Sequence, residues 1–209
     1  MTKAAGTQVL LIRSARTAWD DAGRLQGRAD LPATDAGLAQ TAAELRAYAE
    51  TSDKQPAVVY APDDEGARTT AAAAAAAFDA KAKTADGFRA INLGLWEGLT
   101  AEDLEERHPR NFRQWREHPA TVIVPEGESV TDFQERALAA FAKLLERHPK
   151  KALAVVLRPL EFVVIDRLLG DRPLNGVMAA DPWDGPGARE HGVSAERVRS
   201  LLDEVKASV

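Results

Sequence analysis

Three short apolar runs limit the folds that this chain can adopt. They are Val9–Ile12, Ala57–Tyr60 and Ala152–Leu157. Apolar runs of about four to eight residues are typical of strands that are buried on both faces of a sheet. Segments with helical spacing of apolar residues lie between the runs, and this alternation favours a parallel sheet covered on both sides. We therefore predict an α/β fold, a three-layer sandwich with a mainly parallel central sheet flanked by helices.

Helices are predicted where apolar residues recur at helical spacing behind a capping residue. Thr34 and Thr100 are the expected N-caps of two of them, and Asp103 is the expected partner in a capping box. A run of seven consecutive alanines, Ala71–Ala77, predicts a helix that packs tightly on the sheet. The expected helices are Asp35–Thr51, one opening at Asp63–Glu65, one from Ala101 to His108, one ending at His118, Val130–Arg147 and Leu160–Leu169.

We predict a single domain over residues 1–209, with an unusual C-terminal segment from about residue 176. A chain of 209 residues that is 45% hydrophobic can bury one sizeable core. Ala180–Gly187 is expected to be a loop and Ser194–Lys206 an amphipathic helix. That helix either covers the core, which we favour, or offers a docking face to a partner.

Composition restricts the compartment and the partners. The chain has no cysteine, which excludes disulfides and thiolate metal sites and leads us to expect a cytoplasmic protein. The first residues lack the apolar core of a signal peptide, and no apolar run is long enough to span a membrane. A net charge of -5 without a lysine–arginine block argues against nucleic-acid binding.

Three motifs connect this sequence to a known family. The first strand ends at Arg13 and continues as Ser14-Ala15-Arg16-Thr17, a position where open α/β sheets bind ligands. Gly94-Leu95-Trp96-Glu97-Gly98 and Gly127-Glu128-Ser129 follow in order. With these motifs, residues 8 to 170 resemble the histidine phosphatase superfamily (phosphoglycerate mutase-like proteins).

The resemblance implies a phosphoryl-transfer site and assigns its parts to five positions. In the family, one histidine accepts the phosphoryl group, a second histidine and two arginines hold its oxygens, and a carboxylate protonates the leaving group. Of these residues, only the first arginine, Arg13, is kept. The four changed positions are Ser14 for the nucleophile, Glu65 for the second arginine, Ala90 for the acid and Arg158 for the second histidine.

The four histidines do not replace the missing ones. Three of them, His108, His118 and His148, precede prolines, and we expect all four, His191 included, to be solvated at helix ends. Their spacing predicts no metal site, and no cofactor is expected. Ser14 as a serine nucleophile would need a base, and no histidine is expected within its reach.

The changed positions suggest a pocket that neutralises its own charge. We expect Arg13 and Arg158 to point into one pocket, with Glu65 and Asp20 as their partners, because a buried cation is costly without a carboxylate. The alternatives are that Glu65 is only a helix N-terminal acid and Arg16 a solvated loop cation. Arg68 either pairs with Glu65 on the helix surface or turns into the pocket as a phosphate ligand.

Two hypotheses on function follow. The first is a catalytically inactive relative, a pseudoenzyme that binds or regulates through a modified phosphate pocket. The second is a phosphatase or phosphoglycerate mutase-like enzyme with weak or altered phosphoryl transfer. The loss of both histidines favours the first. The expected partners are a small anion, a phosphorylated molecule or a protein; the oligomeric state is left open.

Overall fold

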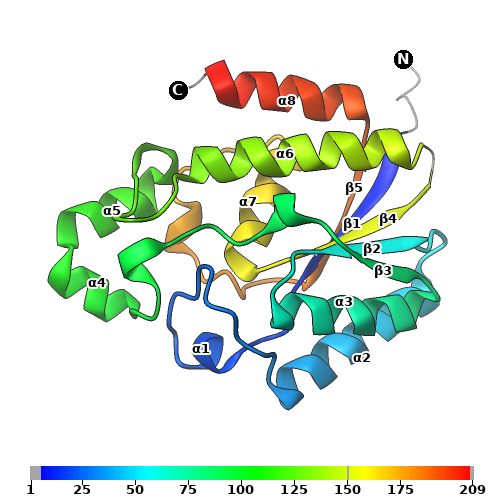
Figure 1. Ribbon diagram of the computed structural model, residues 1–209, viewed down its shortest axis with the longest axis horizontal. Helices are drawn as coiled ribbons and strands as arrows, with labels where there is room; N and C mark the ends of the chain where they lie inside the picture. The colour runs from blue at the N-terminus through cyan, green and yellow to red at the C-terminus, as the bar shows by residue number, and fades with distance from the viewer. Residues whose placement is uncertain (1–5, 150, 208–209) are drawn as a thin grey trace.

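A five-stranded sheet forms the centre of the protein (Figure 1). The computed structural model describes residues 6–149 and 151–207. The strands lie in the order β3-β2-β4-β1-β5, and all neighbours are parallel except β1 and β5. The predicted α/β sandwich with a mainly parallel sheet is confirmed. The strands are β1 (Thr7–Arg13), β2 (Val58–Ala61), β3 (Lys81–Thr84), β4 (Leu153–Leu157) and β5 (Ala188–Val193).

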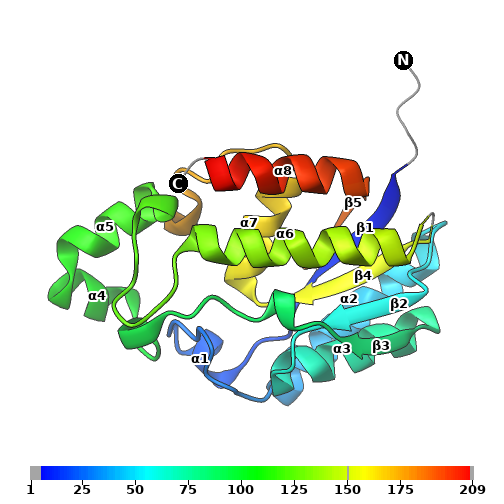
Figure 2. The same ribbon diagram turned by 45° about the horizontal axis from the view of Figure 1, so that its top comes forward.

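Helices cover both faces of the sheet (Figures 1 and 2). α2 and α3 lie on one face, and α6, α7 and α8 lie on the other, with α4 and α5 at one end of α6. Their bounds are α1 (Ala18–Asp21), α2 (Asp35–Thr51), α3 (Glu65–Phe78), α4 (Ala101–Arg107), α5 (Pro109–Glu117), α6 (Val130–Arg147), α7 (Pro159–Leu169) and α8 (Ala195–Ala207). Short 3-10 turns lie at Asp86–Phe88, Gly94–Trp96, Pro119–Thr121 and Val177–Ala179.

The predicted caps are present. Thr34 accepts a hydrogen bond from the Gly37 amide at 3.1 Å and begins α2. Thr100 and Asp103 form the expected capping box at α4. These side chains satisfy amide groups that have no partner inside the helix, which fixes where each helix begins.

Two strands were missed from the sequence. β5 lies in the C-terminal segment and pairs antiparallel with β1, so that Ala188 faces Ile12 and Val193 faces Thr7. β3 is an edge strand in which all four residues are exposed. Both carry mainly polar or small residues, because neither strand is buried on both faces. The apolar-run criterion therefore does not detect them.

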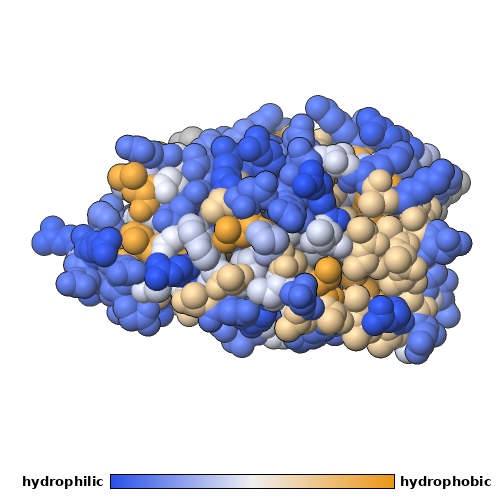
Figure 3. All heavy atoms as spheres, turned by 60° about the horizontal axis from the view of Figure 1, so that its bottom comes forward, coloured by the Kyte–Doolittle hydropathy of each residue, from blue (hydrophilic) through white to orange (hydrophobic). Residues whose placement is uncertain are grey.

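The two faces of the sheet are packed differently. α8 packs along α6 and buries Val198 and Leu201, so the preferred reading of the C-terminal helix as a core cover is confirmed. On the other face, Ala67, Ala71 and Ala74 of α3 are fully or almost fully buried against the sheet, as the alanine run predicted. Figure 3 shows a pale orange, mildly hydrophobic surface on this side. None of the described helices is both long and apolar enough to cross a membrane.

Candidate active site

The candidate site lies where β1 and β4 end side by side. Arg13 of β1 is in register with Leu157 of β4, so the residues that follow them, Ser14 and Arg158, emerge at the same edge of the sheet. The Arg158 guanidinium donates a hydrogen bond from Nη1 to Ser14 Oγ at 3.0 Å. Ser14 is 1% exposed and Arg158 is 3% exposed. The two positions that resemblance assigns to histidines are therefore in direct, buried contact.

Polar side chains of the first loop complete the contacts of Arg158. Its Nη2 lies 3.2 Å from Asp20 Oδ2 and also donates to Gln26 Oε1. Thr17 Oγ1 is 2.8 Å from the same Asp20 oxygen and 2.9 Å from Gln26 Oε1. A carboxylate beside a buried guanidinium offsets much of the cost of removing that charge from water. Asp20 is thus the carboxylate partner of Arg158.

Local structure holds Asp20 in this place. Thr17 caps the four-residue helix α1 and forms a capping box with Asp20. The Ala15 amide donates to Thr70 Oγ1 of α3 at 2.9 Å, which anchors the loop between Ser14 and α1. The carboxylate therefore meets Arg158 from a short, doubly anchored segment.

A buried carboxyl group lies one helical turn beyond Arg158. Glu161 is 2% exposed, and its Oε1 accepts a hydrogen bond from the Ile91 amide at 2.8 Å. Burial raises the pKa of Glu161, against the opposing effects of its backbone hydrogen bonds and of Arg158 and Arg136. Its second oxygen, Oε2, and the Nε of Arg158 are buried without a hydrogen-bond partner.

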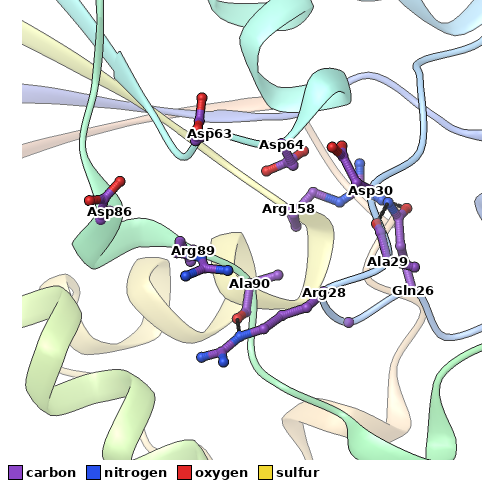
Figure 4. A pocket seen from close by; sticks show the side chains of 11 residues that line it. Gln26, Arg28, Ala29, Asp30, Asp63, Asp64, Asp86, Arg89, Ala90 and Arg158 are labelled. Atoms are coloured by element: carbon purple, nitrogen blue, oxygen red, sulfur yellow. Dashed lines mark hydrogen bonds between the residues drawn. The ribbon is translucent and has the colours of Figure 1, made fainter.

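Two cavities open on either side of Arg158 and share Gln26 and Gly27. We call the larger one, of about 510 Å³, the central cavity; it is lined by Asp20, Arg158, Glu161 and Trp183, with Leu25, Leu93 and Leu160 among the apolar residues. The smaller one, of about 350 Å³, is the acidic cavity shown in Figure 4. It is lined by Asp30, Asp63, Asp64 and Asp86 together with Arg28, Arg89 and Arg158.

Ala90 lies at the wall of the acidic cavity and is 7% exposed. Its carbonyl oxygen accepts hydrogen bonds from Arg28 Nε at 3.3 Å and Arg136 Nη2 at 3.0 Å. Both arginines also bind Glu128 of the Gly-Glu-Ser motif. The backbone at Ala90 is thus held by fixed cations, while its methyl side chain cannot exchange a proton.

The sequence led us to expect that Arg13 and Arg158 point into one pocket. The structure corrects this expectation. Arg13 donates to the carbonyl oxygens of Pro182 at 3.0 Å and Gly185 at 3.3 Å. Its guanidinium carbon lies 4.7 Å from the centre of the Trp183 ring, and that of Arg16 lies 4.0 Å from the same centre. The unexpected strand β5 brings the C-terminal loop over β1, and this loop takes up both cations. Arg16 is also 3.7 Å from Asp21.

Glu65 does not pair with Arg13 or Arg158, so the predicted role of this carboxylate is wrong. It is exposed as the first residue of α3, and its amide donates to Asp30 Oδ1 at 2.7 Å. This matches the alternative of a helix N-terminal acid. Arg68 pairs with Asp63 at 3.3 Å on the surface, neither with Glu65 nor inside a cavity.

The histidines lie away from both cavities. His108, His118 and His148 are the C-caps of α4, α5 and α6, as predicted. His148 is also 2.8 Å from the Tyr60 hydroxyl. The expectation that His191 lies at a helix end is wrong, because this residue lies in β5, with its Nε2 2.9 Å from Asp166 Oδ1. Among the described residues, no histidine lines the central or the acidic cavity.

This combination of a parallel sheet and a buried arginine beyond its central strands defines an α/β protein with its site at the carboxyl edge of the sheet. The chain belongs to the histidine phosphatase superfamily (branch 1), whose family model matches residues 9–159. It is 30% identical to phosphoserine phosphatase 1 of Hydrogenobacter thermophilus over 71% of this chain and 69% of that protein. It is 24% identical to the metal-independent phosphoserine phosphatase of Arabidopsis thaliana over 72% and 63% of the two chains. The solved structure of Bacillus stearothermophilus YhfR matches with a TM-score of 0.73 and 27% identity, over 86% of this chain and 85% of that one.

These relatives contradict the sequence-based hypothesis that the protein is not an enzyme. Both curated relatives are named as phosphatases, which points to an enzyme. The hypothesis rested on the loss of two histidines and treated Arg158 as part of a pocket that neutralises its own charge; Glu161 did not enter it. The structure shows a buried arginine and a buried carboxyl group there.

Three site residues were missed from the sequence. Glu161 is a single acid in the apolar segment Pro159–Ile165, and an acid in the first turn of a helix has an ordinary role at its N-terminus. Gln26 lies in a turn-rich stretch without a motif. Trp183 could have been noticed as an aromatic residue in a loop of glycine, proline and aspartate, but its contact with Arg16 depends on β5.

Proposed function

We propose that the protein is a phosphoryl-transfer enzyme with altered active-site chemistry that hydrolyses small phosphate esters in the central cavity. The observation that carries this proposal is the buried Arg158 at the end of β4, which keeps an unpartnered Nε–H beside Ser14. A buried donor without a partner has lost its hydration, so an anionic oxygen that binds it gains a strong, charge-assisted hydrogen bond.

The lining of the central cavity supports a small organic ester. Arg16 and Arg24 line this cavity together with Arg158 and can bind a phosphoryl group. Carboxyl groups line it as well, those of Asp20, Glu102, Glu161 and Asp181. The leucines of the lining provide a surface for the carbon skeleton and exclude water, and a low local dielectric strengthens the contacts to the phosphate. Within the described part of the chain, the acidic cavity has no leucine in its lining and is therefore less suited to the carbon skeleton of an ester.

Direct attack by water fits this site better than a covalent phosphohistidine. Among the described residues no histidine lines the cavity, and the Ser14 hydroxyl accepts a hydrogen bond from Arg158 without a nearby imidazole base. In our proposal Arg158 holds the phosphoryl oxygens and stabilises the charge that develops on them, a contribution typical of phosphoryl-transfer sites.

The test is phosphate release from phosphoserine and p-nitrophenyl phosphate by the purified protein and by Arg158→Met. We expect turnover by the wild type and a loss of about 100-fold or more in the variant, the usual effect of removing a donor that stabilises the transition state. Equal rates would show that a contaminant or another site is responsible, and an inactive wild type would refute the proposal. Intact-mass analysis during turnover should show no phosphorylated protein; an adduct would contradict direct attack by water.

A further inference from the structure

The first turn of α7 carries an unusual pair of unsatisfied groups. In the described part of the chain, three buried side-chain atoms lack a hydrogen-bond partner: Trp96 Nε1, Arg158 Nε and Glu161 Oε2. The last two belong to Arg158, the N-cap of α7, and to Glu161 in the first turn of that helix. Both residues line the central cavity. Unpaired buried polar atoms are rare in folded proteins, and a cluster of two at one cavity points to a ligand that pairs with both.

Glu161 is suited to hold a proton. The Ile91 amide occupies its Oε1, and Oε2 is free. Complete burial favours the neutral acid and raises the pKa of this carboxyl group. A protonated carboxyl group has one O–H donor, and Oε2, which makes no hydrogen bond, is the oxygen free to carry that proton in a residue that lines the central cavity.

Glu161 lies close to Ala90, the position at which the expected proton donor is missing. Resemblance assigns the proton donor of the reaction to position 90, where a methyl group cannot supply a proton. The Glu161 carboxyl group binds the amide of the next residue, Ile91, from the facing helix α7. A carboxyl group therefore lies beside the same backbone segment, although it comes from a different part of the chain.

We infer that Glu161 is the catalytic acid that protonates the leaving oxygen of the phosphate ester. This inference rests on the proposed function. Water attacks phosphorus, a new P–O bond forms, and the electron pair of the ester P–O bond passes to the leaving oxygen, which takes the Glu161 proton. The products are an alcohol and dihydrogen phosphate. The Glu161 carboxylate then takes one proton from dihydrogen phosphate, which leaves monohydrogen phosphate and restores the acid.

A purely structural Glu161 predicts different behaviour. A carboxyl group that only binds the Ile91 amide would affect all esters equally. A proton donor matters most when the leaving oxygen is strongly basic and hardly at all when it is a good leaving group. The dependence on the leaving group therefore separates the two roles.

The experiment compares wild type and Glu161→Gln on an alkyl phosphate and on 2,4-dinitrophenyl phosphate. Glutamine keeps an oxygen acceptor for Ile91 but has no acidic proton. We expect the kcat of the variant to fall by about 100-fold or more on the alkyl ester and by less than about threefold on the dinitrophenyl ester. The wild-type kcat on the alkyl ester should also fall as pH rises and Glu161 loses its proton, and the variant should lack this alkaline limb.

Asp166→Asn is the matched control. Asp166 is a buried acid on the same helix, but it lines neither the central nor the acidic cavity. This variant should keep the wild-type ratio of the two rates, and thermal melting corrects both variants for their folded fraction. Equal losses on both esters in Glu161→Gln, or an unchanged alkaline limb, would overturn the inference while the phosphatase function stands. A wild type inactive on both esters would overturn the function and the inference together.

Discussion

The two ends of α7 carry buried polar groups in opposite states. Toward its C-terminus, Asp166 accepts hydrogen bonds from His191 and Arg172, and both of its oxygens are used. At its first turn, Arg158 and Glu161 each keep one buried atom without a partner. A satisfied cluster contributes stability and fixes neighbouring elements, here α7 to β5. An incomplete cluster lowers the stability of the fold but leaves polar atoms that a ligand can bind. The two ends of α7 therefore differ in what their polar groups can do.

Removing the guanidinium of Arg158 should produce the largest loss of stability. In Arg158→Met the guanidinium is lost, and Asp20 remains as an unpaired carboxylate whose side chain is 8% exposed. We expect the free energy of unfolding to fall by roughly 3 kcal/mol, since a broken buried pair leaves an uncompensated charge. Chemical denaturation measures this loss. The double variant Arg158→Met/Asp20→Asn should recover part of it; a double variant as unstable as the single one would show that Asp20 is not the partner.

The pH dependence of stability should reveal the buried carboxyl group of Glu161 at the same end of α7. Burial raises the pKa of Glu161 in the folded protein above its ordinary value of 4.5. Its favourable contribution is therefore complete below the unfolded pKa and is lost as pH rises toward the folded value, by up to about 1.4 kcal/mol per pH unit. Glu161→Gln cannot titrate, so its stability should decline less than that of the wild type above pH 4.5. Parallel curves in urea denaturation would argue against a buried acid.

Removing the carboxylate of Asp166 should lower the free energy of unfolding by less and leave catalysis unchanged. Hydrogen bonds from His191 and Arg172 outweigh burial and lower the pKa of Asp166. The stability that this carboxylate contributes is present above its unfolded pKa of about 3.8 and is lost as pH falls through the folded value. Asp166→Asn should lose about 1–2 kcal/mol at pH 7, and thermal melts should converge with those of the wild type as the medium becomes more acidic. An equal loss at all pH values would contradict the charge-based account.

The smallest effect is expected at Glu65. Its side chain is exposed at the start of α3, where an acid gains only from the helix dipole. Glu65→Ala should change the free energy of unfolding by about 0.5 kcal/mol or less, and phosphate should shift the melting temperature of both proteins equally. A larger phosphate-induced shift in the variant would support the idea that Glu65 neutralises the arginines of the pocket.

Sequence patterns were sufficient for the layers of the fold. Buried runs such as Val9–Ile12 and capped helices such as Val130–Arg147 have strong local signals, because burial on both faces or a capping side chain imposes a residue type. The edge of the sheet was predictable to a smaller extent. Most residues of β5 are not buried, so its sequence lacks an apolar run. It is recognised as a strand only from its hydrogen-bonded pairing with β1.

The site could be located from sequence, but its partnerships could not. The ends of β1 and β4 lie at one edge of the sheet, as the sequence indicated, and Ser14 and Arg158 meet there. Which carboxylate meets which arginine depends on side-chain direction and on β5, since that strand brings the loop that captures Arg13. Glu161 gives no local signal, because its unusual feature is a buried carboxyl oxygen without a hydrogen-bond partner, which only the folded structure reveals.

The contact between Ser14 and Arg158 also limits which residues each of the two positions can hold. A small residue on one strand end accommodates a large, charged residue on the next, and Ser14 is 1% exposed. A histidine restored at position 14 alone would need volume that Arg158 already fills, and overpacking a dense interior is destabilising. The two positions are therefore coupled: a histidine at position 14 requires a smaller residue at position 158.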